Sequence, residues 1–139
     1  MKWAIVGSRD YPLPSRVREF IDSLVAQPVP EDKQIYGRNR PTIVSGGAKG
    51  PDSISVEYAK SLGLPTEVFE AQWNRQPDGS YDRTAGFRRN QLIVDASDVV
   101  VAFWDGVSSG TRDTIVRAKK TGKPVIVYGS DGKYRKPPV

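Results

Sequence analysis

Short apolar runs alternate along this chain with longer amphipathic segments. The apolar runs lie at 2–7, 42–47, 65–71, 98–106 and 124–129, and we interpret each as a buried strand. The segments between them, 15–27, 51–62, 84–96 and 110–121, are predicted to be helices. In the first of these, apolar residues fall at i, i+3, i+4, i+7 and i+8, which places them on one face of a helix: Val17, Phe20, Ile21, Leu24 and Val25.

This alternation predicts an α/β fold: a Rossmann-like, doubly wound and mainly parallel five-stranded sheet with helices on both faces. The polar segments 28–41 and 72–86 are predicted to be surface loops. We expect a single nucleotide-binding domain over residues 1–139, in which residues of about 130–139 form a loose tail.

Three of the predicted strands are followed by small, glycine-rich segments. They are GSRD after the first strand, SGGAKG after the second and WDGVSSGT after the fourth. In a doubly wound sheet, ligands bind beyond the carboxyl ends of the strands where the strand order reverses, so these segments are expected to share one rim.

Such a rim suits an anion, because glycine exposes backbone N–H groups and a helix N-terminus adds partial positive charge. Serine and threonine hydroxyls can donate further hydrogen bonds, and arginine and lysine can contact a phosphate directly. The predicted phosphate-binding residues are Gly7, Ser8, Arg9, Ser45, Gly46, Gly47, Ala48, Lys49, Gly50, Arg88, Arg89, Asn90, Gly106, Ser108, Ser109, Gly110 and Thr111. Each glycine alone is better explained by a tight turn, and it is the grouping of three such loops on one rim that favours a ligand.

Other residues on the rim have more specific candidate roles. Trp104 ends the fourth strand, where it can stack on a base or ribose, and Trp73 has a similar place after the third. Asp52 can complement the dipole of its helix, bind a ribose hydroxyl or transfer a proton. Asp105 lies between a strand and the glycine–serine turn.

The composition narrows the chemistry. The chain has no cysteine and no histidine, which excludes disulfides, thiolate nucleophiles, imidazole bases and Cys or His metal sites. The net charge is +5, which fits an anionic partner, although the basic residues are scattered and make nucleic acid a weaker expectation. No apolar run is long enough to span a bilayer, so no membrane partner is expected and the cytoplasm is the expected location.

Four motifs resemble a known family. VGSRDY, SGGAKGPDS, AGFRRNQLIVDASDVVVAFWDGVSSGTRDTI and AKKTGKPVIV, which together span about residues 3–128, are similar to the YspA-like (cpYpsA-related) branch of the SLOG superfamily. This resemblance implies a Rossmann-like domain that binds nucleotides or nucleotide-derived ligands. The superfamily includes LOG enzymes, which release ribose 5-phosphate from nucleoside monophosphates, and DprA, which binds single-stranded DNA.

The LOG comparison assigns tentative catalytic residues. The LOG motif Gly-Gly-x-Gly-Thr-x-x-Glu is matched at Gly110 and Thr111, but Thr114 stands at the glutamate position and Asp113 lies one residue earlier. Because one residue turns a helix by about 100°, Asp113 need not reach the same point. Arg88 or Arg89 corresponds to a catalytic LOG arginine, and Asp52, Asp82 and Asp105 are other candidate carboxylates.

Three functions therefore stay open at this point. The first is a sensor or sequestering module for a nucleotide-derived small molecule, with no metal site of its own and Mg²⁺ entering only through the ligand. The second is a nucleoside monophosphate N-glycosidic hydrolase that uses Asp113 and Arg89. The third is a DprA-like single-stranded nucleic-acid binder. A homo-oligomer is compatible with all three.

Overall fold

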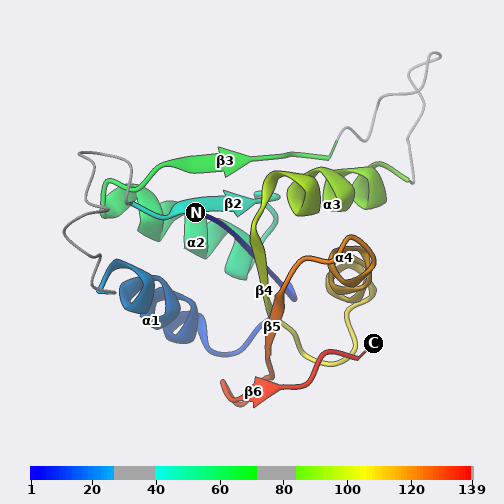
Figure 1. The fold of residues 1–139 in the computed structure, drawn as a ribbon. Helices are drawn as coiled ribbons and strands as arrows, with labels where there is room; N and C mark the ends of the chain where they lie inside the picture. Colours follow the sequence, from blue (N-terminus) through cyan, green and yellow to red (C-terminus); the bar gives the residue numbers. More distant parts are fainter. Residues whose placement is uncertain (27–39, 72–83, 139) are drawn as a thin grey trace.

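The computed structural model describes residues 1–26, 40–71 and 84–138. Most of the two predicted loops lies outside these ranges, and so do the candidate residues Trp73 and Asp82. The described part of the chain forms one central sheet with helices on both faces (Figure 1). Among the described residues, no helix combines the length and the apolar character needed to cross a membrane.

The sheet confirms the predicted doubly wound fold. Its strands are β1 (Lys2–Gly7), β2 (Thr42–Ser45), β3 (Thr66–Val68), β4 (Val99–Phe103), β5 (Val125–Tyr128) and β6 (Tyr134–Arg135). They lie in the order β3-β2-β1-β4-β5-β6, and β1 to β5 are parallel. β2 and β3 lie on one side of β1, and β4, which follows them in the sequence, lies on the other side of β1. The carboxyl ends of β1 and β4 therefore mark the switch point at which such sheets bind ligands.

Alternate strand residues divide the core into two layers. Ile5 of β1 packs with α1 (Pro14–Val25) and α2 (Pro51–Ser61), whereas its neighbours Ala4 and Val6 face α3 (Ala85–Ala96) and α4 (Ser109–Lys120). Strand side chains alternate between the faces of a sheet, so a strand covered on both faces must be apolar throughout. All five residues of β4 are accordingly buried.

The sixth strand is a correction to the sequence prediction, which gave five strands and a loose tail after residue 130. Tyr134 and Arg135 pair with β5 in antiparallel register. The reversal is a tight turn in which the Gly132 N–H donates to the Gly129 carbonyl at 2.9 Å, with Gly132 at a φ of 76°. Asp131-Gly132 is a common turn pair, but a two-residue strand gives too little hydrophobic pattern to be recognised.

Candidate functional site

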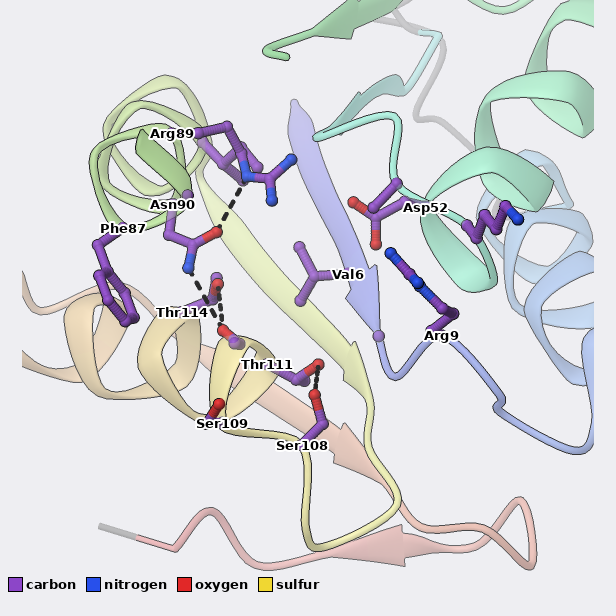
Figure 2. Close-up of a pocket in the computed structure, with 16 residues that line it drawn as sticks. Val6, Arg9, Asp52, Phe87, Arg89, Asn90, Ser108, Ser109, Thr111 and Thr114 are labelled. Carbon is purple, nitrogen blue, oxygen red and sulfur yellow. Dashed lines mark hydrogen bonds between the residues drawn. The ribbon is translucent and has the colours of Figure 1, made fainter. Parts of the chain in front are cut away.

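A cavity of about 320 Å³ opens at the switch point, over the carboxyl ends of β1 and β4 (Figure 2). The loops after β1, β2 and β4 reach it, as the sequence predicted, and α3 closes a further side. Its lining residues are Val6, Gly7, Arg9, Ala48, Lys49, Asp52, Gly86, Phe87, Arg89, Asn90, Ile93, Ser108, Ser109, Gly110, Thr111 and Thr114.

The first turn of α4 forms one wall of this cavity. Backbone N–H groups in the first turn of a helix have no intrahelical acceptor, and the N-cap residue Ser108 makes no side-chain capping bond to them. Its hydroxyl lies instead 3.3 Å from the hydroxyl of Thr111. Ser109 and Gly110 line the cavity in the same turn, and a Cβ added at Gly110 would meet no atom within 4 Å. This wall can therefore receive an anion on N–H and hydroxyl donors.

Asp105 shapes the loop that leads into α4. Its carboxylate accepts hydrogen bonds from the N–H groups of Val107 and Ser108, both at 2.8 Å. These bonds, that of Ser108 first, lower the pKa of Asp105. The Asp105 N–H donates in turn to the hydroxyl of Ser8, which is buried against β4. Asp105 thus positions the turn that leads into α4 without lining this cavity.

Asp52 is the one acidic side chain among the described residues that line the cavity. It lies in the first turn of α2, is 4% exposed, and accepts the Gly46 N–H at 3.0 Å. The N–H of Gly7 also bonds to this carboxylate. Asp52 therefore joins the carboxyl ends of β1 and β2 at the floor of the site.

Burial raises the pKa of Asp52 from 3.8 to about 6. The N–H groups of Gly46 and Gly7, the positive charge of Arg89 and the Ser45 hydroxyl oppose the rise but do not cancel it. At neutral pH the carboxylate is ionised in a place that disfavours its charge. A residue of this kind in a cavity is a candidate for ligand contact or proton transfer.

Arg89 crosses from α3 to the loop after β2. Its Nη1 donates to the Gly46 carbonyl at 3.0 Å, and its Nε donates to the Asn90 side-chain oxygen at 3.2 Å. Gly46 is thus bound on one side by Asp52 and on the other by Arg89. A Cβ at Gly46 would lie 2.4 Å from Arg89 Nη1, so the guanidinium occupies the space that a larger residue would need.

The surplus of glycines after β2 has a different cause from the one predicted. The N–H groups of Gly46 and Gly47 do not face the cavity, because they donate to Asp52 and to the Ser45 hydroxyl. Gly50 has a φ of 91°, and its Cβ would lie 2.7 Å from the carbonyl oxygen of Arg9. The close approach inferred from these glycines is therefore made by the protein's own chain, and only Ala48, Lys49 and Asp52 of this segment reach the cavity.

Asp113, the tentative catalytic carboxylate, does not line the cavity. It lies on α4 toward α3, where it accepts hydrogen bonds from Arg117 Nε at 2.7 Å and from Asn90 Nδ2 at 3.0 Å. Asn90 itself is 7% exposed and lines the cavity, so Asp113 supports it from behind. The one-residue displacement from the LOG motif has turned the carboxylate away, and Thr114 lines the cavity in its place.

Other predicted rim residues also lie elsewhere. Trp104 donates its indole N–H to the Ser108 carbonyl at 2.9 Å and lines a second cavity, on the β6 side, together with Asp105 and Gly106. Arg88 bonds to Thr84 on the exposed side of α3. The predicted residues that do not line the first cavity are Ser8, Ser45, Gly46, Gly47, Gly50, Arg88, Trp104, Asp105, Gly106 and Asp113.

Sequence reasoning missed several lining residues, of which Phe87 is chemically the most informative. Its ring lies beside the cavity on the α3 side and is 46% exposed (Figure 2). Phe87 directly precedes Arg88 and Arg89 in AGFRRN, and an aromatic residue beside these candidate phosphate ligands was a usable signal. The other lining residues that were not predicted are Val6, Gly86 and Ile93, which are small or apolar and carry no such signal, and Thr114, which the sequence marked only as the residue at the LOG glutamate position.

Comparisons with known proteins fit this fold. No family model matches the chain. DprA from Streptococcus pneumoniae superposes with a TM-score of 0.70 at 21% identity, over 94% of this chain and 53% of that one. DprA from Helicobacter pylori, described by its single-stranded DNA binding mode, gives 0.65 at 24% over 92% and 65%. TM1055, a structural genomics target, gives 0.63 at 19% over 90% and 72%. The chain thus spans between half and two thirds of the two DprA chains.

These likenesses show that the protein shares the Rossmann-like fold of these structures. The Gene 61 protein of Mycobacterium phage D29 is 33% identical over 93 residues, which cover 63% of this chain and 70% of that protein. The chain belongs to the family of this phage protein.

Proposed function

We propose that this protein binds a nucleotide or a nucleotide-derived small molecule in the switch-point cavity and acts as a sensor or sequestering module. The observation that carries the proposal is the lining of the cavity, where the first turn of α4 and three basic residues, Arg9, Lys49 and Arg89, are combined in one space. We also place the chain in the YspA-like branch of the SLOG superfamily, on its motifs VGSRDY and SGGAKGPDS.

The phosphate belongs at the first turn of α4. Helix N-termini bind phosphates through N–H groups and the helix dipole, and the hydroxyls of Ser108 and Thr111 add donors there. Arg9 and Lys49 are exposed at the cavity, so their charges can attract an anion and partly neutralise it. Mg²⁺ would enter this site with the phosphate of the ligand.

The base belongs beside Phe87. An aromatic ring that is half exposed at a cavity can stack on a planar base, and such stacking is worth about 1–3 kcal/mol. The cavity volume of about 320 Å³ is at the small end of the usual range for small-molecule sites, roughly 300–1,000 Å³, which favours a mononucleotide over a dinucleotide.

Hydrolysis of a nucleoside monophosphate is the second candidate function. It requires a carboxylate at the reacting sugar, and Asp113 is bound to Arg117 and Asn90 instead. Asp52 is the carboxylate that a hydrolase built on this cavity would use, with Arg89 beside it. Release of free base from ribonucleoside monophosphates, lost in Asp52→Asn but unaffected by Asp113→Asn, would establish this activity.

Single-stranded DNA binding is the third, and the likeness to the two DprA structures is the observation that favours it. Two features disfavour DNA binding. The cavity is small, and Phe87 is the single aromatic ring among its described lining residues, whereas strand binding uses a row of stacking side chains. Tight oligonucleotide binding that persists at high salt would favour the DNA-binding function over ours.

The proposed function is tested with Arg89→Ala. We expect this variant to bind its nucleotide about 10- to 100-fold more weakly, because a hydrogen bond to a charged group contributes about 1.5–3 kcal/mol. A thermal-shift panel of ribonucleotides, NAD and ADP-ribose first selects the ligand, and calorimetry then gives both dissociation constants.

Arg18→Ala is the matched control, because Arg18 is exposed on α1, on the opposite face of the sheet. It removes the same charge and should leave the affinity within about twofold of the wild type, as expected for a screened distant charge. Equal losses of nucleotide affinity in both variants would mean that only the net charge of the protein matters. That result would contradict the proposed site.

A further inference from the structure

The cavity pairs an anion-binding wall with one acid. Arg9, Lys49 and Arg89 are the basic residues of its lining, and Asp52 is the single acidic side chain among its described lining residues. Figure 2 shows Asp52 and Arg9 on one side, and Phe87, Asn90 and the first turn of α4 on the other. A ligand that fills this space must present a negative group, a planar group and a group that tolerates a carboxylate.

The carboxylate of Asp52 is held in one position. Oδ2 accepts the Gly46 N–H at 3.0 Å, and the Gly7 N–H also bonds to the carboxylate. The backbone carbonyl of Asp52 is bound as well, by the hydroxyls of Ser45 at 3.1 Å and Ser55 at 2.7 Å. The side chain is therefore held in place, because its carboxylate and its backbone are bonded to the ends of β1 and β2 and to α2.

Acceptor capacity remains on this carboxylate. Two carboxylate oxygens offer about four acceptor sites, and the N–H groups of Gly46 and Gly7 fill two of them. A carboxylate that is 4% exposed, and that lines a cavity, must bond to the ligand group that displaces water from it, since an unpaired buried charge is strongly unfavourable. The ligand must therefore bring a hydrogen-bond donor to Asp52.

We infer that this donor is a ribose hydroxyl, and that Asp52 makes the cavity selective for ribonucleotides over deoxyribonucleotides. The inference rests on the proposed nucleotide function. A phosphate at α4 and a base at Phe87 both lie on the side of the cavity opposite Asp52. The sugar that links them then turns its hydroxyl edge toward Asp52. A second phosphate is repelled from that position by the carboxylate, whereas a hydroxyl donates to it.

The selectivity has a measurable size. A site built to bond a substrate hydroxyl discriminates strongly against the analogue that lacks it, because the protein group is then left unpaired. We expect the wild-type protein to bind a ribonucleoside 5′-monophosphate about 10- to 100-fold more tightly than its 2′-deoxy or 2′-O-methyl counterpart, the range for a hydrogen bond to a charged group. The 2′-O-methyl compound keeps the oxygen but replaces the donated hydrogen by a methyl group, and the 2′-deoxy compound removes the hydroxyl without adding bulk, so the two together test the donor requirement.

Isothermal titration calorimetry at pH 7.5 compares the four ribonucleoside 5′-monophosphates with their 2′-deoxy and 2′-O-methyl forms. In Asp52→Asn and Asp52→Ala the ribo-to-deoxy ratio should fall to within about threefold of one. Asp95→Asn is the matched control: Asp95 is exposed on α3, outside the cavity, and this variant should keep the wild-type ratio. Thermal melts verify that each variant is folded, and if neither Asp52 variant folds, the wild-type series alone decides.

Equal affinity of the wild type for ribo and deoxy forms would overturn the inference and leave nucleotide binding intact. A ratio that survives in both Asp52 variants would overturn the role given to Asp52. No binding of any nucleotide to the wild type would refute the proposed function, and this inference with it.

Discussion

Replacing Gly50 by alanine should lower the free energy of unfolding by about 4 kcal/mol. Gly50 has φ 91° and ψ −141°, a region that is essentially restricted to glycine. Its Cβ would also lie 2.7 Å from the Arg9 carbonyl oxygen and 2.9 Å from that of Ser8. Both contacts are with backbone, which cannot move aside without separating α2 from the loop after β1. For a chain of this size, the melting temperature should fall by roughly 10–20 °C.

Gly110→Ala is the matched comparison. Gly110 lies in the first turn of α4, and a Cβ there meets no atom within 4 Å, so alanine should stabilise the helix by about 0.5–1 kcal/mol. Its methyl group would nevertheless enter the cavity at the proposed phosphate position and weaken ligand binding. Differential scanning fluorimetry and calorimetry separate the two effects. A Gly50→Ala protein as stable as the wild type would contradict the role of this glycine in packing.

The second large effect is a pH-dependent gain of stability in Asp52→Asn. The pKa of Asp52 in the folded protein, about 6, lies above its unfolded value of 3.8, because burial disfavours the charge. The folded state therefore binds this proton more tightly, which stabilises the protein fully below about pH 4. That stabilisation is lost as the pH rises to about 6, and two pKa units correspond to about 3 kcal/mol.

Asparagine does not titrate, so the variant escapes this loss. The melting temperature of Asp52→Asn minus that of the wild type should rise by roughly 10 °C between pH 4 and pH 7. The exposed Asp95→Asn should show a much smaller change over the same range. A difference that stays constant with pH would contradict the account of Asp52 as a buried charge. If Asp52→Asn is more stable than the wild type and also loses ribonucleotide selectivity, then the charge of Asp52 lowers the stability of the wild type but serves ligand binding.

The sequence predicted the framework of this protein well. Apolar runs and helical stripes gave the order of the elements, and the parallel sheet followed from them, because strands covered on both faces must be apolar. That framework placed the loops after β1, β2 and β4 on one rim. Gly7, Arg9, Lys49, Arg89 and the first turn of α4 consequently lie around one cavity, as expected.

Side-chain direction and pairing were not predictable at the same level. The carboxylate of Asp52 accepts the N–H of Gly46, six residues earlier, and that of Gly7, which is distant in sequence and meets it only after the sheet has formed. Gly46 leaves room for the side chain of Arg89, and Gly50 leaves room for the backbone of the loop after β1. No local sequence pattern encodes these contacts. Asp113 depends on the residue at which α4 starts, since one position turns a side chain by about 100°.

The central claim is that a nucleotide phosphate binds at the first turn of α4, and two-dimensional ¹H–¹⁵N NMR of the wild type tests it most directly. The spectrum is recorded during titration with the tightest-binding ribonucleotide of the panel. The account predicts the largest shifts at the backbone amides of Ser109, Gly110 and Thr111, with further changes at Arg89 and Asp52. Saturable shifts confined to other surfaces, such as the edge of β3 or the second cavity beside β6, would contradict it.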